Sequence, residues 1–218
     1  MFGDELDPEG QLGAGRDALL ARLRADGSLT EDAVEAIALV PRERFVPARH
    51  AEVAYEDAAL EIGPAATISA PSMVAAMLAV MDVAPGQRVL EIGAGSGYAA
   101  ATVAALGARV VAVEIQAELV EQARANLDAA GFADRVEVVL GDGRLGWPDG
   151  APYDRILVSA AVPALPSAWL DQLAPDGLLV YPEAGDEEDI LVRLSNGPEG
   201  LRREEAGRCR FVRLQLDG

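Results

Sequence analysis

The chain has no lysine, and it has only one cysteine and one histidine among its 218 residues. A single thiol cannot form an internal disulfide, so a disulfide-stapled fold is excluded. Cys209 and His50 are also too few to build a zinc site of the cysteine–histidine type. We therefore expect a protein without a metal site.

Aromatic residues are scarce as well, at 5% of the chain, although 50% of the residues are hydrophobic. The core must therefore consist mainly of valine, leucine, isoleucine and alanine. The many small residues favour closely packed layers of helix on sheet. A chain of this length is expected to form one large domain.

Positive charge is in short supply, with 18 arginines against 36 acidic residues and a formal net charge of −18. Such a surface repels phosphate backbones, so we expect no nucleic-acid partner. It is also the composition of an acidic proteome, whose protein surfaces stay well hydrated. No apolar run reaches the length of a membrane span, and the acidic start lacks the basic residues of a signal peptide. We expect a cytoplasmic monomer without a membrane partner.

The first 82 residues are predicted to contain mainly helices and loops. Residues 1–15 are acidic and glycine-rich, and we expect them to be flexible. Ser69 is predicted to cap a helix that runs to about Met81, with Pro71 in its first turn. The other expected segments are helices over 16–25 and 31–39 and an irregular stretch over 51–68. Residues 16–82 would form a helical cap and acceptor loop within the same domain as the rest.

From Arg88 onward, short apolar strands alternate with helical patterns, which indicates a parallel sheet built from strand–helix–strand units. The sequence predicts an α/β fold with a mostly parallel central sheet, helices on both faces and an antiparallel edge. Residues 83–218 would form this core. The expected strands are 88–92, 110–113, 136–140, 153–159, 177–181, 190–194 and 209–216, and the expected helices are 98–106, 117–129 and 166–173.

A glycine-rich turn follows the first strand of this core and opens a helix. Gly93, Gly95 and Gly97 allow the backbone to turn tightly and to approach a ligand closely. Their Gly-x-Gly-x-Gly spacing departs from the Gly-x-Gly-x-x-Gly fingerprint of dinucleotide sites. The turn therefore indicates a nucleoside-type ligand other than a dinucleotide.

Acidic residues end the first three strands of the core. Glu91 lies in the first, Glu114 ends the second, where a carboxylate can bind ribose hydroxyls, and Asp142 follows the third, where it can accept from an adenine amino group. A pyrophosphate would require positive potential, whereas the sulfonium of S-adenosylmethionine suits an acidic pocket. We therefore predict S-adenosylmethionine as the cofactor and a Rossmann-like methyltransferase fold.

Several motifs together resemble the protein-L-isoaspartate O-methyltransferase family, over roughly residues 20–214. They are Val40–Pro47, Ala54–Asp57, Thr67–Pro71, Val89–Tyr98, Gly141–Arg144, Ala151–Asp154 and Ala160–Pro163. The resemblance implies S-adenosylmethionine-dependent methylation of the free α-carboxylate of L-isoaspartyl residues, which starts the repair of damaged proteins. It places Ser69, with Thr67 and Ile68, at the reacting carboxylate. The cofactor residues that it implies are Glu91, Gly93, Gly95, Gly97, Glu114, Ile115, Asp142 and Gly143.

The chemistry of an α-carboxylate agrees with these residues. Its pKa is roughly 3.5, so it is already ionised at pH 7 and needs no general base. A dry, aligned approach to the sulfonium is sufficient. As a helix cap, Ser69 would offer its hydroxyl and free backbone N–H groups to an anion.

Two departures from the family pattern leave the acceptor open. Ala65 and Ala66 stand where the family often has glutamine, and Arg213 replaces a proline in the closing motif. Arg213 is interpreted as a surface strand residue, with binding of a substrate carboxylate as the other reading. The alternatives are a divergent paralogue acting on another carboxylate or on nucleic acid, and a cofactor-binding protein without turnover. A nicotinamide-dependent oxidoreductase is disfavoured by the glycine spacing.

Overall fold

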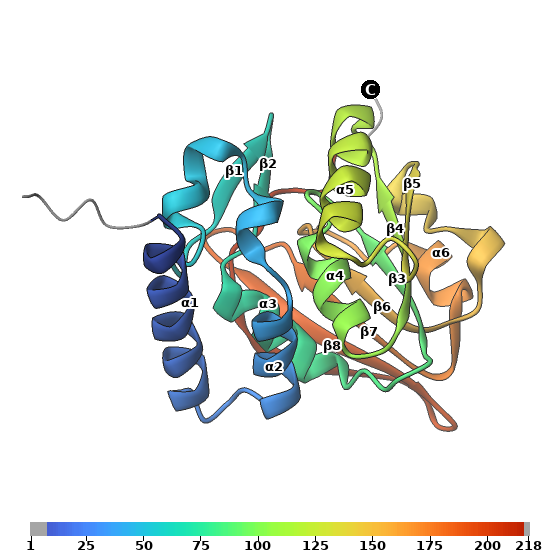
Figure 1. Ribbon diagram of the computed structural model, residues 1–218. Coiled ribbons are helices and arrows are strands. Elements are labelled where there is room, and N and C mark those ends of the chain that lie inside the picture. Colours follow the sequence, from blue (N-terminus) through green and yellow to red (C-terminus); the bar gives the residue numbers. More distant parts are fainter. Residues whose placement is uncertain (1–7, 216–218) are drawn as a thin grey trace, which may run out of the picture.

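A central sheet of seven strands organises the computed structural model, which describes residues 8–215 (Figure 1). The strand order is β5-β4-β3-β6-β7-β8-β9, in which the first five strands are parallel and the last two are antiparallel additions. The strands are β3 (Arg88–Ile92), β4 (Arg109–Glu114), β5 (Val136–Leu140), β6 (Tyr153–Val158), β7 (Leu173–Glu183), β8 (Asp189–Gly197) and β9 (Gly200–Cys209). The predicted mostly parallel sheet with an antiparallel edge is confirmed.

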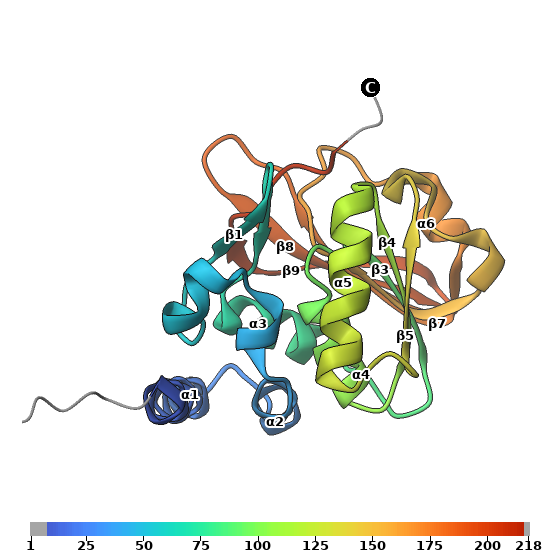
Figure 2. The ribbon, with the colours of Figure 1, turned by 45° about the horizontal axis from the view of Figure 1, so that its top comes forward.

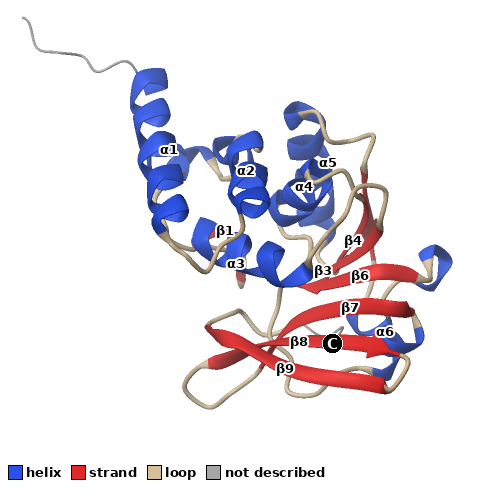
Figure 3. Cartoon of the chain, turned by 90° about the horizontal axis from the view of Figure 1, so that it is seen from below, coloured by secondary structure: helices blue, strands red, loops and turns tan. Residues whose placement is uncertain are grey.

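Helices cover both faces of the sheet, but unequally (Figures 2 and 3). Five lie on one side and share one large apolar cluster with it, whereas the opposite face packs mainly on α6 around the buried Trp169. The helices are α1 (Pro8–Ala25), α2 (Glu31–Leu39), α3 (Pro71–Met81), α4 (Tyr98–Ala105), α5 (Ala117–Ala130) and α6 (Ser167–Asp171). Short 3-10 turns connect them: η1 (Arg42–Phe45), η2 (Ala48–Val53), η3 (Gly143–Leu145) and η4 (Pro148–Gly150).

The central strands are mainly apolar because both of their faces are largely buried. In β3, Val89 points into the cluster on the α4–α5 side, while Leu90 and Ile92 join Trp169 on the other side. Alternation of this kind fixes the register of the sheet, since a shift by one residue would exchange the two faces.

The N-terminal segment is helical over more of its length than predicted. α1 begins at Pro8, so the expectation of a flexible segment is wrong for residues 8–15; the rest of that segment lies outside the described residues. Leu12 packs against the same core as Leu19 and Leu23, which extends the apolar stripe by two turns. This packing outweighs the low helix propensity of Gly13 and Gly15.

The C-terminal strand was predicted in the wrong place. The last strand is β9, at Gly200–Cys209, and residues 211–215 form no strand of the sheet. β9 is an exposed edge strand rich in arginine and glutamate, so it lacks the alternating apolar pattern that marks half-buried strands. The segment after it instead crosses the carboxyl ends of the sheet.

A small hairpin replaces part of the stretch that was expected to be irregular. Its strands are β1 (Leu60–Gly63) and β2 (Ala66–Ile68), and Thr67 pairs with Glu61. Ala65, in the turn, has a φ of 51°, a left-handed conformation that favours glycine. The hairpin carries Thr67 and Ile68 to the edge of the sheet.

Ala65→Gly is expected to stabilise the protein by roughly 1 kcal/mol, because glycine relieves the left-handed strain at this position by more than it adds to the entropy of the unfolded chain. Thermal unfolding should show a melting temperature about 2–4 °C higher. Ala66→Gly, in β2, is the matched control and should lower it. Equal shifts for both variants would contradict the assignment of strain to Ala65.

Candidate active site

The carboxyl ends of β3, β4, β5 and β6 meet at one edge of the sheet, where the strand order reverses at β3. Ligands of open α/β sheets bind at such switch points. Two hollows lie here. The first is lined by Gly143, Glu114 and the segment 212–215, among others, and the second by Ile68, Ser69 and Glu91. The residues common to both are Thr67, Gly93, Gly95 and Ser159.

The glycine turn has the conformation that its sequence predicts. Gly93 and Gly95 have φ values of 86° and 53°, which side chains rarely adopt, and both glycines line the two hollows. Gly97 also has a positive φ but lines neither hollow. A Cβ at Gly97 would lie 3.2 Å from the side chain of Leu127, so this glycine serves the packing of α4 on α5.

Glu114 holds the turn from the neighbouring strand. Its carboxylate accepts hydrogen bonds from the backbone N–H groups of Gly95 (2.8 Å), Ile115 (2.9 Å) and Gln116 (3.0 Å). It is buried, with 6% of its surface exposed, yet it lines the first hollow together with Ile115. Carboxylate oxygens can accept about four hydrogen bonds in all, so Glu114 retains capacity for a ligand.

Glu91 is the most unusual titratable group at this edge. Its Oε1 accepts a hydrogen bond from the Ser159 hydroxyl (2.8 Å), but its buried Oε2 has no partner among the described residues. Burial, helped by the charge of Glu114, raises the pKa of Glu91 to about 8, against the hydrogen bond from Ser159 and the nearby Ala100 backbone N–H, which lower it. An unpartnered buried carboxylate oxygen requires a proton or a cation.

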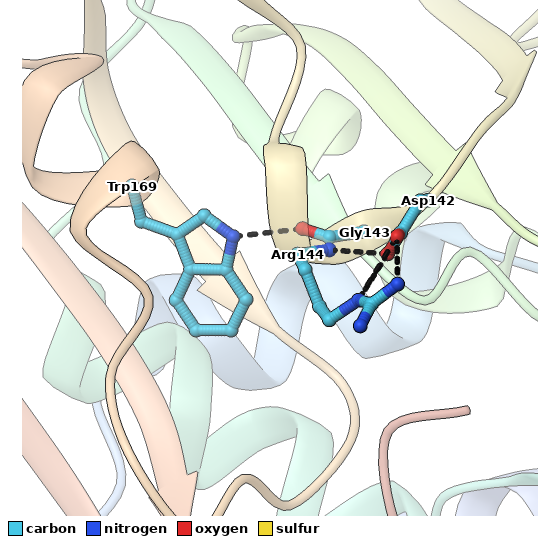
Figure 4. Close-up of polar contacts among 4 residues, drawn as sticks. All are labelled: Asp142, Gly143, Arg144 and Trp169. Atoms are coloured by element: carbon cyan, nitrogen blue, oxygen red, sulfur yellow. Dashed lines mark hydrogen bonds and ion pairs between the residues drawn. The ribbon is translucent and has the colours of Figure 1, made fainter. Parts of the chain in front are cut away.

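Asp142 and Gly143 face different neighbours (Figure 4). The Arg144 guanidinium folds back onto the Asp142 carboxylate at 2.5 Å, and hydrogen bonds from Arg144 lower the pKa of Asp142. Asp142 therefore lines neither hollow, unlike Gly143. The Gly143 carbonyl accepts from the Trp169 indole N–H (2.7 Å), and a Cβ at Gly143 would lie 2.6 Å from Ile92.

Thr67, Ile68 and Ser69 lie together at the end of β2. All three line the second hollow, and Thr67 lines the first as well. Within residues 8–215, no hydrogen bond involves the hydroxyl of Thr67 or of Ser69. Both hydroxyls are therefore available to a ligand.

The prediction that Ser69 caps α3 is wrong. The N-cap residue is Ala70, and its side chain makes no capping bond. The Ser72 N–H instead donates to the Asp57 carboxylate (2.9 Å), which occupies part of the anion-binding position predicted for a substrate.

Asp57 is held in place by a buried arginine. The Arg42 side chain donates to the carbonyls of Ala54 (2.8 Å) and Ala58 (3.3 Å), on either side of Asp57. It is fully buried, and its guanidinium lies 4.8 Å from the centre of the Tyr98 ring. The connector around Arg42 thus shapes the loop that caps α3.

Sequence reasoning missed three polar residues at the site. Ser159 binds Glu91, and two glutamines connect the segments around the first hollow. The Gln116 amide donates to the Pro64 carbonyl (3.2 Å) and to Gln215 (3.3 Å), and the Gln215 amide donates to the Ala65 carbonyl (3.3 Å). Nothing in the local sequence distinguishes these glutamines from surface residues.

Arg213 is neither a strand residue nor a free cation. Its guanidinium forms an ion pair with the buried Asp189 (2.5 Å) and donates to the Gly185 carbonyl (3.0 Å). The residue lines the first hollow. Arg213 is exposed, as predicted for a surface residue, but it forms only an isolated bridge with Ala161 outside the named strands, and its ion pair attaches the C-terminal segment to β8.

Solved structures share this architecture. A structure titled protein-L-isoaspartate O-methyltransferase superposes with a TM-score of 0.84 at 28% identity, over 92% of this chain and 66% of the other. A putative protein-L-isoaspartate O-methyltransferase from Plasmodium falciparum, in complex with S-adenosyl-L-homocysteine, has the same fold, with a TM-score of 0.81 at 24% identity over 92% of this chain and 98% of the other. The fold, the glycine turn and the acidic strand ends define a Rossmann-like methyltransferase.

The sequence comparisons identify the family. The model of the protein-L-isoaspartate(D-aspartate) O-methyltransferase family matches residues 14–216. The protein-L-isoaspartate O-methyltransferase of Methylorubrum populi is 48% identical over 90% of both chains, and that of Aeropyrum pernix is 47% identical over 85% of this chain and 73% of its own. The chain therefore belongs to the protein-L-isoaspartate(D-aspartate) O-methyltransferase family.

Family membership confirms the predictions of an α/β methyltransferase fold, of an S-adenosylmethionine-dependent carboxyl O-methyltransferase and of isoaspartyl residues as its target. Between residues 8 and 215, no helix combines the length and the apolar composition needed to cross a bilayer.

Proposed function

We propose that the two hollows hold the two reactants of one methyl transfer. The first hollow would take the nucleoside part of S-adenosylmethionine, and the second would take the α-carboxylate of an L-isoaspartyl residue. The observation that carries this proposal is that the hollows share Thr67, Gly93, Gly95 and Ser159, so that ligands in them would adjoin.

The residues at the first hollow fit the cofactor. Gly93, Gly95 and Gly143 present backbone without side chains, and Glu114 retains acceptor capacity for ribose hydroxyls. Glu91 lines the second hollow instead, and its unpartnered Oε2 suits the positively charged sulfur of a cofactor that reaches the shared residues. Ile115 would contact the adenosine beside Glu114. Gly97 supports the turn through α5, and Asp142 orients the Gly143 loop through Arg144.

When bound, S-adenosylmethionine supplies a methyl group on a positively charged sulfur. The acceptor carboxylate, with a pKa of roughly 3.5, is ionised at pH 7, so the protein needs to remove no proton. The hydroxyls of Ser69 and Thr67 would donate hydrogen bonds to this carboxylate and orient one oxygen toward the shared residues. Ile68, which is 3% exposed, would keep water from the junction.

The partners follow from the charge. With a net charge of −18, the protein is proposed to act on proteins and peptides rather than on nucleic acid. We keep a cytoplasmic monomer as the working proposal for its location and assembly. Sedimentation of the full chain tests whether the protein is a monomer.

Ser69→Ala is expected to lower kcat on an isoaspartyl peptide by about tenfold to a hundredfold, since it removes one hydrogen bond to the reacting carboxylate, and to leave cofactor affinity nearly unchanged. The assay follows labelled methyl from S-adenosylmethionine into matched peptides with isoaspartyl or aspartyl residues. Ser72→Ala, three residues further on and outside both hollows, is the control.

Label in the isoaspartyl peptide alone supports the proposed acceptor. Binding of cofactor without label in either peptide would exclude it and favour a protein without this turnover. An unchanged rate in Ser69→Ala would remove Ser69 from the mechanism.

A further inference from the structure

A separate cavity, distinct from the two hollows of the active site, lies at the opposite edge of the sheet, where β3, β4 and β5 begin. It measures about 560 Å³ and shares no residue with either hollow of the active site. Arginine is the residue that distinguishes it: of 18 arginines in the chain, four line this cavity. They are Arg88, Arg109, Arg124 and Arg135.

Three of these arginines lie side by side in a row across the starts of adjacent strands. Arg88 pairs directly with Arg109 in the parallel register of β3 and β4. Arg135 stands beside Arg109, because the next residues, Val110 and Val136, are register partners. Like charges that face one another across strands repel, so this row costs stability unless a negative charge lies between its members.

Direct ion pairs do not neutralise the row. Among residues 8–215, no carboxylate forms an ion pair with Arg88, Arg109 or Arg135. The side chain of Arg109 has no hydrogen bond to any residue in this part of the chain. In a chain with twice as many acids as arginines, such a group of unpaired cations is unexpected.

The neighbours of Arg109 each donate to a backbone carbonyl, which restricts the motion of these exposed side chains. Arg124 donates to the Val138 carbonyl (2.7 Å) and pairs with Glu121 (2.9 Å). Arg88 donates to the Gly150 carbonyl and lies 6.0 Å from the centre of the Tyr153 ring. Arg135 donates weakly to the Ala104 carbonyl (3.4 Å). A guanidinium has five N–H groups, so each anchored arginine retains donors for a ligand.

Two carboxylates, Asp134 and Glu137, also line the cavity and limit what it can accept. They would repel a long polyanion, as would the charge of the rest of the surface. The geometry points to a site for a small multivalent anion, a phosphate group in free or esterified form, bound by Arg88, Arg109 and Arg135.

The test is titration of the full chain with inorganic phosphate and with adenosine monophosphate, against chloride at equal ionic strength. Phosphate is expected to raise the melting temperature of the wild type and to give saturable heat in calorimetry. Arg109→Gln should weaken that binding by about tenfold or more, through the loss of charge-assisted hydrogen bonds. Arg22→Gln on α1, which removes the same charge elsewhere, should bind phosphate like the wild type.

The two ligands distinguish the source of the phosphate, and the variants test its place of binding. Tighter binding of the nucleotide that persists in saturating S-adenosyl-L-homocysteine, which occupies the adenosine hollow, identifies an esterified phosphate as the ligand, whereas binding of phosphate alone identifies the free anion; either supports the site. Equal shifts in Arg109→Gln and the wild type, or no effect beyond that of chloride, would overturn it. So would displacement of phosphate by S-adenosyl-L-homocysteine, which would place the anion in the active site. Methyl transfer by Arg109→Gln should be unchanged, so failure of this site is separable from failure of the proposed function.

Discussion

Glu91→Gln is expected to make the protein more stable above pH 7 and, at the same time, to weaken cofactor binding. The Glu91 side chain is 1% exposed, and its Oε2 makes no hydrogen bond within the described residues. Glutamine keeps the size of the side chain and removes its ionisation. The variant therefore separates the effect of the buried charge on stability from its effect on cofactor binding.

The sign of the effect follows from the direction of the pKa shift. Burial raises the pKa of Glu91 from 4.5 to about 8 in the folded protein, so between these values the unfolded chain has lost a proton that the folded protein retains. Stability therefore falls as the pH rises from 4.5 to 8. The full cost is several kcal/mol, on the order of 5, at pH 8 and above.

Urea unfolding of the ligand-free protein at pH 5, 6.5 and 8 measures this cost. The variant should gain over the wild type as the pH rises, and the gap should be small at pH 5. Glu35→Gln, at an exposed position of α2, is the control and should show no pH-dependent gap. A gap of the same size at all three pH values would show that Glu91 is ionised throughout.

Cofactor affinity should depend on the same ionisation of Glu91. A positively charged ligand favours the ionised form of Glu91, so affinity for S-adenosylmethionine should rise by up to about tenfold per pH unit between pH 6 and 8. Calorimetry at pH 7 in two buffers of different ionisation enthalpy should detect release of close to one proton. In Glu91→Gln, both the pH dependence and the proton release should disappear.

The fold could be predicted from the sequence because its signals are local. The apolar runs of β3 and β4 are largely buried on both faces, and α5, between β4 and β5, carries a clear 3.6-residue pattern. Where burial is one-sided or absent the prediction fails, as in the exposed edge strand β9. α1 was predicted too short because Gly13 and Gly15 obscure a stripe that tertiary packing completes.

The candidate site could be predicted only in part, for a related reason. Positions fixed by backbone geometry, such as Gly93 and Gly95, follow from the sequence. Contacts between distant segments do not: the Asp57 bond to Ser72 spans 15 residues, and the Gln215 bond to Ala65 spans 150. The fold brings these polar side chains together, and no pattern of residue spacing in the sequence predicts their contacts.

Asp189→Asn is expected to release the C-terminal segment from the first hollow and to weaken cofactor binding more than it lowers kcat. Asp189 is 3% exposed and accepts from the Phe211 N–H (2.8 Å), the Arg213 guanidinium (2.5 Å) and the Gly185 N–H (3.3 Å). These contacts place residues 212–215, which line the hollow. Loss of the charge should cost about 1–3 kcal/mol, at the low end because Arg213 is more than half exposed.

Hydrogen exchange reports the release directly. The Leu214 N–H, which donates to the Ala161 carbonyl (3.0 Å), should exchange faster in the variant, whereas amides of β3 should not change. Glu188→Gln, which removes the neighbouring exposed ion pair with Arg208, is the matched control. The Kd for S-adenosyl-L-homocysteine should rise in Asp189→Asn alone.

Acid should mimic the substitution in the wild type. Although burial raises the pKa of Asp189, the hydrogen bonds from Arg213, Phe211 and Gly185 outweigh it and hold this pKa below its usual range. The stability that Asp189 contributes is therefore present above the unfolded-state pKa of about 3.9 and is lost as the pH falls through the lower folded-state value. Leu214 exchange, corrected for the intrinsic effect of pH, should thus become faster only in that acidic range. Release of the segment near neutral pH would show that another group holds it in place.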